Sequence, residues 1–121
     1  MDSKNILIVE DSRLFGDILT ASLKSECPCM SIIKATTYQE AVRMIQSTDI
    51  SVCLLDIHLP DGSGLDLILR IKHTNPEATV IVLTAHDGKE FEKAAYQNGA
   101  TQFLSKRNFH IDDIATFCHC C

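Results

Sequence analysis

The sequence lacks the features of membrane-spanning, secreted and nucleic-acid-binding proteins. No apolar run approaches the length of a membrane span, and the short run at residues 6–9 ends at two acids without a signal-peptide cleavage site. Basic residues are few, because 11 Lys and Arg stand against 16 Asp and Glu and leave a formal net charge of −5. Direct nucleic-acid binding needs a dense basic face, so it is not expected. We expect a cytoplasmic domain that neither enters a membrane nor binds nucleic acid directly.

Internal repeats, low-complexity tracts and linkers are absent from the sequence as well. A length of 121 residues fits one domain, and a hydrophobic content of 45% is enough to bury an ordinary core. A charged content of 22% gives no indication of disorder. We therefore expect residues 1–121 to form one folded domain.

Five short runs of apolar and β-branched residues alternate with stretches of helical spacing. The runs, which predict strands, are residues 5–9, 30–35, 51–55, 78–83 and 101–104. Strands this apolar are typical of a parallel sheet that is covered on both faces. Right-handed crossovers between them predict a doubly wound α/β domain, (βα)5, with a five-stranded parallel sheet.

The intervening stretches carry helix signals. Residues 38–45 repeat apolar side chains at helical spacing, and Thr37 with Glu40 forms a possible capping box before them. Gly99 and Pro76 stand where helices are expected to end. The segment 13–25 predicts a broader apolar face, made by Leu14, Phe15, Ile18, Leu19, Ala21 and Leu23.

Polar residues follow the predicted strands at the sheet edge where ligands of doubly wound folds bind. They are Glu10, Asp11, Asp56, Thr84, Ser105 and Lys106. Clustered carboxylates repel one another unless a cation lies among them, and oxygen ligands suit Mg²⁺. One carboxylate can then act as a nucleophile toward a phosphoryl donor, while Lys106 and Thr84 stabilise charge on the transferring oxygens.

Four segments, in this order and spacing, resemble the response-regulator receiver family. They are ILIVEDS, LLDIHLPDGSG, VIVLTA and FLSK, and the resemblance covers essentially the whole chain. Each segment alone is a weak signal, but all four at the ends of the right strands are specific. The resemblance implies a receiver domain of two-component signalling with the flavodoxin-like strand order 2-1-3-4-5.

The resemblance also implies a role for each residue of the predicted metal and acceptor site. Glu10 and Asp11 resemble the acidic pair that binds Mg²⁺, and Asp56 resembles the phosphoacceptor. The backbone carbonyl of His58 would supply a further metal ligand. The phosphoryl donor would be a sensor histidine kinase or a phosphotransfer protein, and some receivers accept small acyl phosphates. Such a domain is a switch that catalyses its own phosphorylation and dephosphorylation, not a turnover enzyme.

Three further residues resemble the family's switch. Thr84 and Lys106 match the pair that holds the phosphoryl oxygens, and Phe103 matches the aromatic residue whose ring turns inward when the threonine moves. Phe103 could instead be a permanent core residue. The face made by the fourth helix, fifth strand and fifth helix would then change its partner preference, homodimerisation included. An output domain, if any, is expected beyond this chain.

The sequence departs from the family pattern near the expected site. His58 and His86 lie two residues after Asp56 and Thr84, where such side chains tune the lifetime of the phosphoryl group; they could equally be exposed loop residues. The family usually has a cis proline after the lysine, but Arg107 follows Lys106 here. A cis bond at that position costs about 3 kcal/mol, so we predict a trans bond.

Six cysteines need an interpretation, and reduced thiols are expected in a cytoplasmic chain. Cys53 lies in a strand pattern and is assigned to the core. The Cys27-Pro28-Cys29 segment is interpreted as a loop, since it lacks the Cys-x-x-Cys spacing of redox sites. The tail Cys118-His119-Cys120-Cys121 is spaced too tightly for an ordinary structural zinc site.

Two other classes of protein are weighed against a phosphoacceptor. A pseudo-receiver, which binds partners without taking phosphate, usually lacks the acceptor, an acid or the lysine, and all are present here. A haloacid-dehalogenase-type enzyme places a second Asp two residues after the nucleophile, where this chain has His58.

Overall fold

A five-stranded parallel sheet forms the centre of the computed structural model, which describes residues 5–85 and 89–118. The strands are β1 (Asn5–Val9), β2 (Ser31–Ala35), β3 (Val52–Leu55), β6 (Thr79–Thr84) and β7 (Gln102–Ser105). Their order is β2-β1-β3-β6-β7, and every pairing is parallel. A small hairpin, β4 (His58–Leu59) with β5 (Gly62–Ser63), lies outside this sheet. The predicted flavodoxin-like order 2-1-3-4-5 of the main strands is confirmed.

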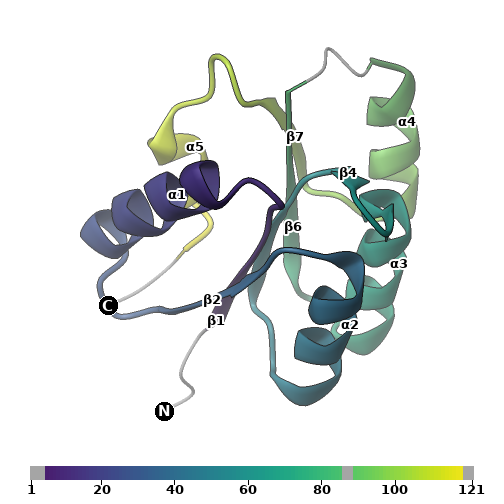
Figure 1. Ribbon diagram of the computed structural model, residues 1–121, viewed down its shortest axis with the longest axis horizontal. Helices are drawn as coiled ribbons and strands as arrows, with labels where there is room; N and C mark the ends of the chain where they lie inside the picture. The colour runs from purple at the N-terminus through teal and green to yellow at the C-terminus, as the bar shows by residue number, and fades with distance from the viewer. Residues whose placement is uncertain (1–4, 86–88, 119–121) are drawn as a thin grey trace.

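The helices cover both faces of the sheet. They are α1 (Arg13–Glu26), α2 (Tyr38–Ser47), α3 (Gly64–Thr74), α4 (Lys89–Asn98) and α5 (Ile111–Ala115). Figure 1 shows α1 and α5 on one side of the sheet and α2, α3 and α4 on the other. The doubly wound α/β architecture is therefore confirmed, and no helix in the described ranges is long and apolar enough to cross a membrane.

The core consists of two apolar layers, one on each face of the sheet. Along β1, Leu7 and Val9 pack into the layer under α2, α3 and α4, while Ile6 and Ile8 pack into the layer under α1 and α5. This alternation follows from the two-residue period of a strand. Both faces are buried, so the strands read as continuous apolar runs in the sequence.

Helix α1 buries a narrower stripe than the sequence predicts. Leu19 and Leu23 are 2% and 0% exposed, but Leu14 is 73% and Ile18 is 52% exposed. The predicted broad apolar face is wrong, because only one side of the helix can contact the sheet. Leu14 and Ile18 lie on the solvent side.

Helix ends agree with the predicted signals except in one detail. The hydroxyl of Thr37 accepts a hydrogen bond from the Glu40 amide at 3.1 Å, which confirms the N-cap. The Glu40 carboxylate, however, accepts from the amide and hydroxyl of Thr36, so the predicted capping box is not closed on Thr37. Gly99 has a φ of 116°, as expected for a residue that ends a helix in the left-handed region.

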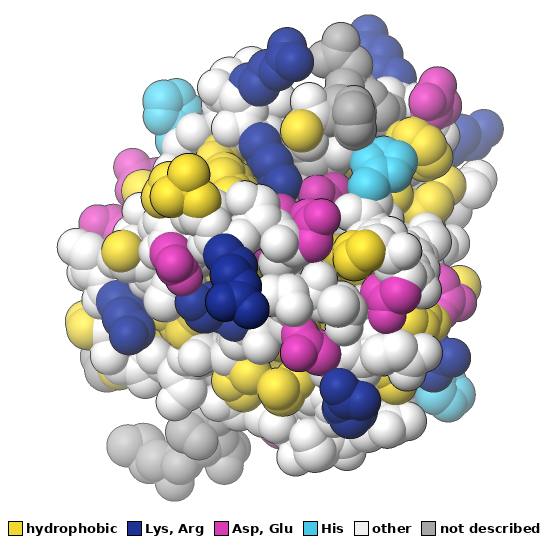
Figure 2. Space-filling view, in the orientation of Figure 1, with side chains coloured by type: hydrophobic (Ala, Val, Ile, Leu, Met, Phe, Trp, Pro, Cys, Tyr) yellow, Lys and Arg dark blue, Asp and Glu magenta, His cyan; other side chains and the backbone are white. Residues whose placement is uncertain are grey.

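The molecular surface carries charges of both signs. On the face shown in Figure 2, Lys and Arg side chains are scattered among acidic and hydrophobic ones and do not form one continuous basic patch. This distribution agrees with the net charge of −5.

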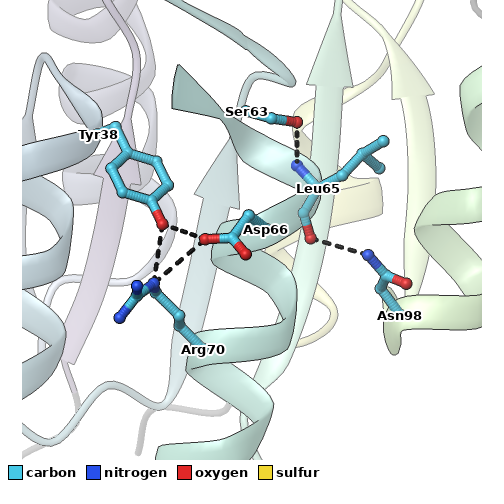
Figure 3. Close-up of polar contacts among 6 residues, drawn as sticks. All are labelled: Tyr38, Ser63, Leu65, Asp66, Arg70 and Asn98. Carbon is cyan, nitrogen blue, oxygen red and sulfur yellow. Dashed lines mark hydrogen bonds and ion pairs between the residues drawn. The ribbon is translucent and has the colours of Figure 1, made fainter. Parts of the chain in front are cut away.

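Helix α3 is fastened to its two neighbours by side-chain contacts (Figure 3). The Tyr38 hydroxyl on α2 donates to the Asp66 carboxylate, and Arg70 donates to both, at 2.8 Å and 3.2 Å. The hydrogen bond from Tyr38, together with Arg70, lowers the pKa of Asp66. On the other side, the Asn98 amide of α4 donates to the Leu65 carbonyl at 2.9 Å. These bonds fix the start of α3, which follows the loop after Asp56.

Candidate functional site

Backbone pairing continues one residue beyond three strands and fixes the residues that follow them. The Glu10 amide donates to Ala35 at 3.0 Å, the Asp56 amide to Val9 at 3.1 Å, and the Lys106 amide to Thr84 at 2.9 Å. Glu10, Asp56 and Lys106 are therefore held at the same edge of the sheet by main-chain hydrogen bonds.

Three carboxylates converge at this edge, as the sequence predicts. One carboxylate oxygen from each of Glu10, Asp11 and Asp56 lies within 4.8 Å of the other two. Glu10 and Asp56 are only 5% and 7% exposed, whereas Asp11 is exposed. All three donors are oxygen atoms, so the set suits a hard divalent cation such as Mg²⁺ or Ca²⁺.

Lys106 lies among these carboxylates and binds two of them. Its Nζ is 2.6 Å from Glu10 Oε1 and 3.1 Å from Asp56 Oδ2. Burial raises the pKa of Glu10, and the hydrogen bond from Lys106 opposes that rise. Burial also acts to lower the pKa of Lys106, but the hydrogen bond to Glu10 and the charge of Asp56 raise it overall. The lysine is therefore a cation in this site.

The second oxygen of each buried carboxylate accepts a backbone hydrogen bond. The Ser12 amide donates to Glu10 Oε2 at 3.0 Å, and the His58 amide donates to Asp56 Oδ1 at 3.1 Å. These bonds orient both carboxylates.

The Phe15 ring contacts the ammonium group of Lys106, and the sequence does not reveal this contact. The Lys106 Nζ lies 4.7 Å from the centroid of the Phe15 ring, within cation–π range. Phe15 in turn packs edge-on against Phe109 at 6.1 Å. From the sequence, the helical spacing of Phe15 predicts only that it belongs to an apolar face of α1.

The loop after Asp56 depends on two residues, Asp61 and Gly64, to which the sequence analysis gives no role. The Asp61 carboxylate accepts hydrogen bonds from the amides of Tyr38 and Gln39, at 2.7 Å and 3.2 Å, and so fastens the loop to the start of α2. Gly64 packs so closely that an added Cβ would lie 2.4 Å from the Asp56 carbonyl oxygen. Pro60 and Asp61 form the turn that joins β4 to β5.

The remaining predicted residues surround this centre or lie outside the described part of the chain. Thr84 is 2% exposed at the end of β6 and lies opposite Ser105 of β7. Phe103 is partly buried against the apolar layer under α2, α3 and α4. His58 is exposed and its ring packs edge-on against Phe91 at 5.2 Å, whereas His86 lies outside the described residues.

The loop after Lys106 has the predicted peptide geometry. No cis peptide bond occurs among the residues that the structure describes, so Arg107 follows Lys106 through a trans bond.

Comparisons with known proteins agree with this geometry. A sequence model of the response regulator receiver domain matches residues 6–117. The transcriptional regulatory protein PmrA of Pectobacterium parmentieri is 36% identical over 104 residues, which cover 84% of this chain and 45% of that protein. A cyclic di-GMP phosphodiesterase of Thermotoga maritima is 34% identical over 101 residues, covering 84% of this chain and 26% of that protein.

A solved structure has the same fold. The crystal structure of a response regulator protein from Burkholderia pseudomallei, with a phosphorylated aspartic acid, calcium ion and citrate, matches with a TM-score of 0.86. It is 25% identical, and the match covers 97% of this chain and 67% of that one. The chain thus spans less than half the length of the two curated relatives above. By its sequence and its fold, it belongs to the response regulator receiver domain family of two-component signalling.

Proposed function

We propose that this receiver domain takes a phosphoryl group onto Asp56 in a Mg²⁺-dependent reaction and transmits that event through a change of surface. The observation that carries the proposal is the position of Lys106, whose ammonium group bonds both Glu10 and Asp56 beside a third carboxylate. This arrangement supports a site in which Asp56 would act as the nucleophile, Lys106 as a fixed cation and the carboxylates as metal ligands.

The reaction forms a bond between a carboxylate oxygen of Asp56 and phosphorus, and it breaks the bond between phosphorus and the donor. Glu10, Asp11, Asp56 and the His58 carbonyl would hold Mg²⁺, which neutralises charge on the carboxylates and the phosphoryl oxygens when bound. The His58 amide keeps one Asp56 oxygen in place. Lys106 remains charged and stabilises the transferring oxygens.

The switch would start at Thr84 and Phe103. Thr84 is the last residue of β6, and its carbonyl accepts a hydrogen bond from the Lys106 amide. Its hydroxyl would donate to a phosphoryl oxygen, and Phe103 on the neighbouring strand would turn into the space that Thr84 leaves. The face made by α4, β7 and α5 would then favour a different partner, including a second copy of the chain.

Two histidines are proposed to tune the lifetime of the phosphoryl group. His58 is exposed in the loop after Asp56, and its ring packs edge-on against Phe91. Replacing His58 or His86 by alanine should change the half-life of the phosphorylated protein. An unchanged half-life in both variants would remove this role.

The phosphoryl donor is proposed to be a sensor histidine kinase or phosphotransfer protein in the cytoplasm. Small acyl phosphates would serve as surrogate donors. Any output activity, such as those named for the relatives, would belong to a linked domain outside this chain. We expect no membrane insertion and no direct nucleic-acid binding by the domain itself.

The test is incubation with acetyl phosphate and Mg²⁺, followed by intact-mass measurement. We expect addition of one phosphoryl group to the native chain and none to Asp56→Asn or to samples with a chelator. Absence of modification in the folded native chain would instead favour a phosphorylation-independent pseudo-receiver. Turnover of phosphate esters would favour a dehalogenase-type enzyme, and none is expected.

A further inference from the structure

The hairpin that follows Asp56 has few buried residues to hold it in place. Its strands β4 and β5 have two residues each, and of residues 58–63 only Leu59 is partly buried against the core. An isolated hairpin is at best marginally stable in water. The hairpin nevertheless begins at His58, whose amide bonds Asp56 Oδ1 and whose carbonyl is proposed above as a metal ligand. Contacts with other elements must therefore fix its position.

Tyr38, the first residue of α2, makes three such contacts. Its amide and that of Gln39 donate to the Asp61 carboxylate at the hairpin turn, at 2.7 Å and 3.2 Å. Its ring lies against Gly62 of β5, where an added Cβ would come within 2.6 Å of ring atoms. Its hydroxyl donates to Asp66 in the first turn of α3 (Figure 3). One residue thus contacts the turn, the second strand and the helix that follows.

Arg70 holds the Tyr38 side chain in this position. Its Nε donates to the Tyr38 hydroxyl oxygen at 2.8 Å and to Asp66 Oδ2 at 3.2 Å, and its guanidinium carbon lies 5.8 Å from the ring centroid. The hydrogen bond to Asp66 raises the pKa of Tyr38, so the hydroxyl keeps the proton that it donates. Asp66 and Arg70 are half exposed, so their ion pair alone stabilises little. Its effect is to orient the tyrosine beside the hairpin.

We propose that Tyr38 is a positioning residue for the divalent cation, because it holds the hairpin, and with it the His58 carbonyl, in place before the ion binds. The inference rests on the proposed function of the site, and it concerns a residue that would touch neither the ion nor Asp56. Ligands that are already in place bind a cation more tightly than ligands that must first be ordered.

The test is a Mg²⁺ titration of the native chain and its variants, followed by the NMR shifts of the backbone amides around Asp56. Tyr38→Ala removes the ring that contacts Gly62 and should raise the dissociation constant of Mg²⁺ about tenfold, the lower end of the range for outer partners of metal ligands. Tyr38→Phe keeps the ring and loses only the hydroxyl bonds, so it should raise the constant about threefold. Asp61→Ala, which removes the acceptor of the two α2 amides, should resemble Tyr38→Ala.

Lys72→Met is the matched control, because it removes a side-chain hydrogen bond at the other end of α3. The Lys72 ammonium group donates to the Ala78 carbonyl at 2.8 Å, the same length as the bond from Arg70 to Tyr38. Lys72→Met should bind Mg²⁺ as tightly as the native chain, whatever loss of stability urea unfolding reports for it. This comparison separates positioning of the hairpin from a general loss of stability.

A second readout is the Mg²⁺ dependence of phosphorylation by acetyl phosphate. Tyr38→Ala should raise the half-saturating Mg²⁺ concentration by the same factor as the dissociation constant. It should reach the native rate at saturation, because the bound ion then fixes the hairpin. A purely structural role would lower the amount of active protein and leave the half-saturating concentration unchanged.

Equal Mg²⁺ affinities of the native chain, Tyr38→Ala and Asp61→Ala, all with folded spectra, would overturn the proposal. A lower rate at saturating Mg²⁺ with an unchanged half-saturating concentration would overturn it as well. The proposed function fails differently, since a native chain that binds Mg²⁺ but takes no phosphoryl group would contradict that function alone. In that case the Mg²⁺ affinities of the variants still decide the role of Tyr38.

Discussion

Two lysine–carboxylate ion pairs in this domain have the same length but different surroundings. Lys106 and Glu10 are 2.6 Å apart with side chains 15% and 4% exposed, and Lys34 and Asp17 are also 2.6 Å apart with side chains 45% and 67% exposed. Replacing each lysine by methionine keeps most of the apolar side chain and removes its charge. The pair of variants therefore compares a buried lysine that binds two carboxylates with an exposed lysine that binds one.

The two substitutions should lower the free energy of unfolding by amounts that differ severalfold. Removing one partner of a fully buried pair costs about 3–5 kcal/mol, because the remaining charge is left without compensation. Lys106 retains some exposure, so we expect Lys106→Met to lower the free energy of unfolding by about 3 kcal/mol. Lys34→Met should lower it far less, since water screens an exposed pair.

The assay is urea unfolding at neutral pH with a chelator present. The change in the free energy of unfolding is calculated from the shift in the urea midpoint, provided that the dependence on urea concentration has the same slope in each protein. A domain of ordinary stability would still be folded with either substitution. Adding Mg²⁺ should narrow the difference between Lys106→Met and the native chain, because the ion replaces the missing positive charge. Equal losses for the two variants would refute the view that Lys106 compensates buried carboxylates.

Three further predictions concern the scaffold of the site. Gly64→Ala should destabilise the domain by about 2–3 kcal/mol and slow phosphorylation, because its Cβ would overlap the Asp56 carbonyl oxygen. Gly16→Ala in α1, where no heavy atom beyond the neighbouring residues and the helix's own backbone lies within 4 Å of the added Cβ, should instead stabilise the domain by about 0.5–1 kcal/mol. A loss of stability in both variants, measured by urea unfolding, would contradict this. Leu19→Ala should lower the free energy of unfolding by about 2–5 kcal/mol, whereas Leu14→Ala should change it by less than about 0.5 kcal/mol. Similar losses in the two variants would show that Leu14 is buried. The lowered pKa of Asp66 means that its stabilising effect is present above the ordinary carboxyl pKa of about 3.9 and is lost as the pH falls through its folded-state pKa. The free energy of unfolding of Asp66→Asn should therefore fall less steeply than that of the native chain as the pH is lowered. The same pH dependence in both proteins would count against this role.

The order of elements and the placement of the acidic residues follow from local sequence pattern. Strands buried on both faces are continuous apolar runs, and the residues after parallel strands lie at one sheet edge. Glu10, Asp56 and Lys106 are therefore predictable neighbours. The strand ends shift slightly, since β6 includes Thr84 and β7 includes Ser105.

Contacts set by the packing of distant segments are not encoded in such patterns. The spacing of α1 offers two adjacent apolar stripes and does not decide which one contacts the sheet, so the exposure of Leu14 is not predictable. Phe15 beneath Lys106 and Asp61 at the start of α2 join segments that no local signal connects.

The most direct test of the central claim is an amide NMR spectrum of the ¹⁵N-labelled chain before and after adding beryllofluoride with Mg²⁺. If Asp56, Thr84 and Lys106 form one phosphoryl site, the largest shifts should start at their amides and extend along β7 to Phe103. Asp56→Asn should show none of these changes. A native spectrum that stays unchanged, or that changes only far from Asp56, would contradict the account.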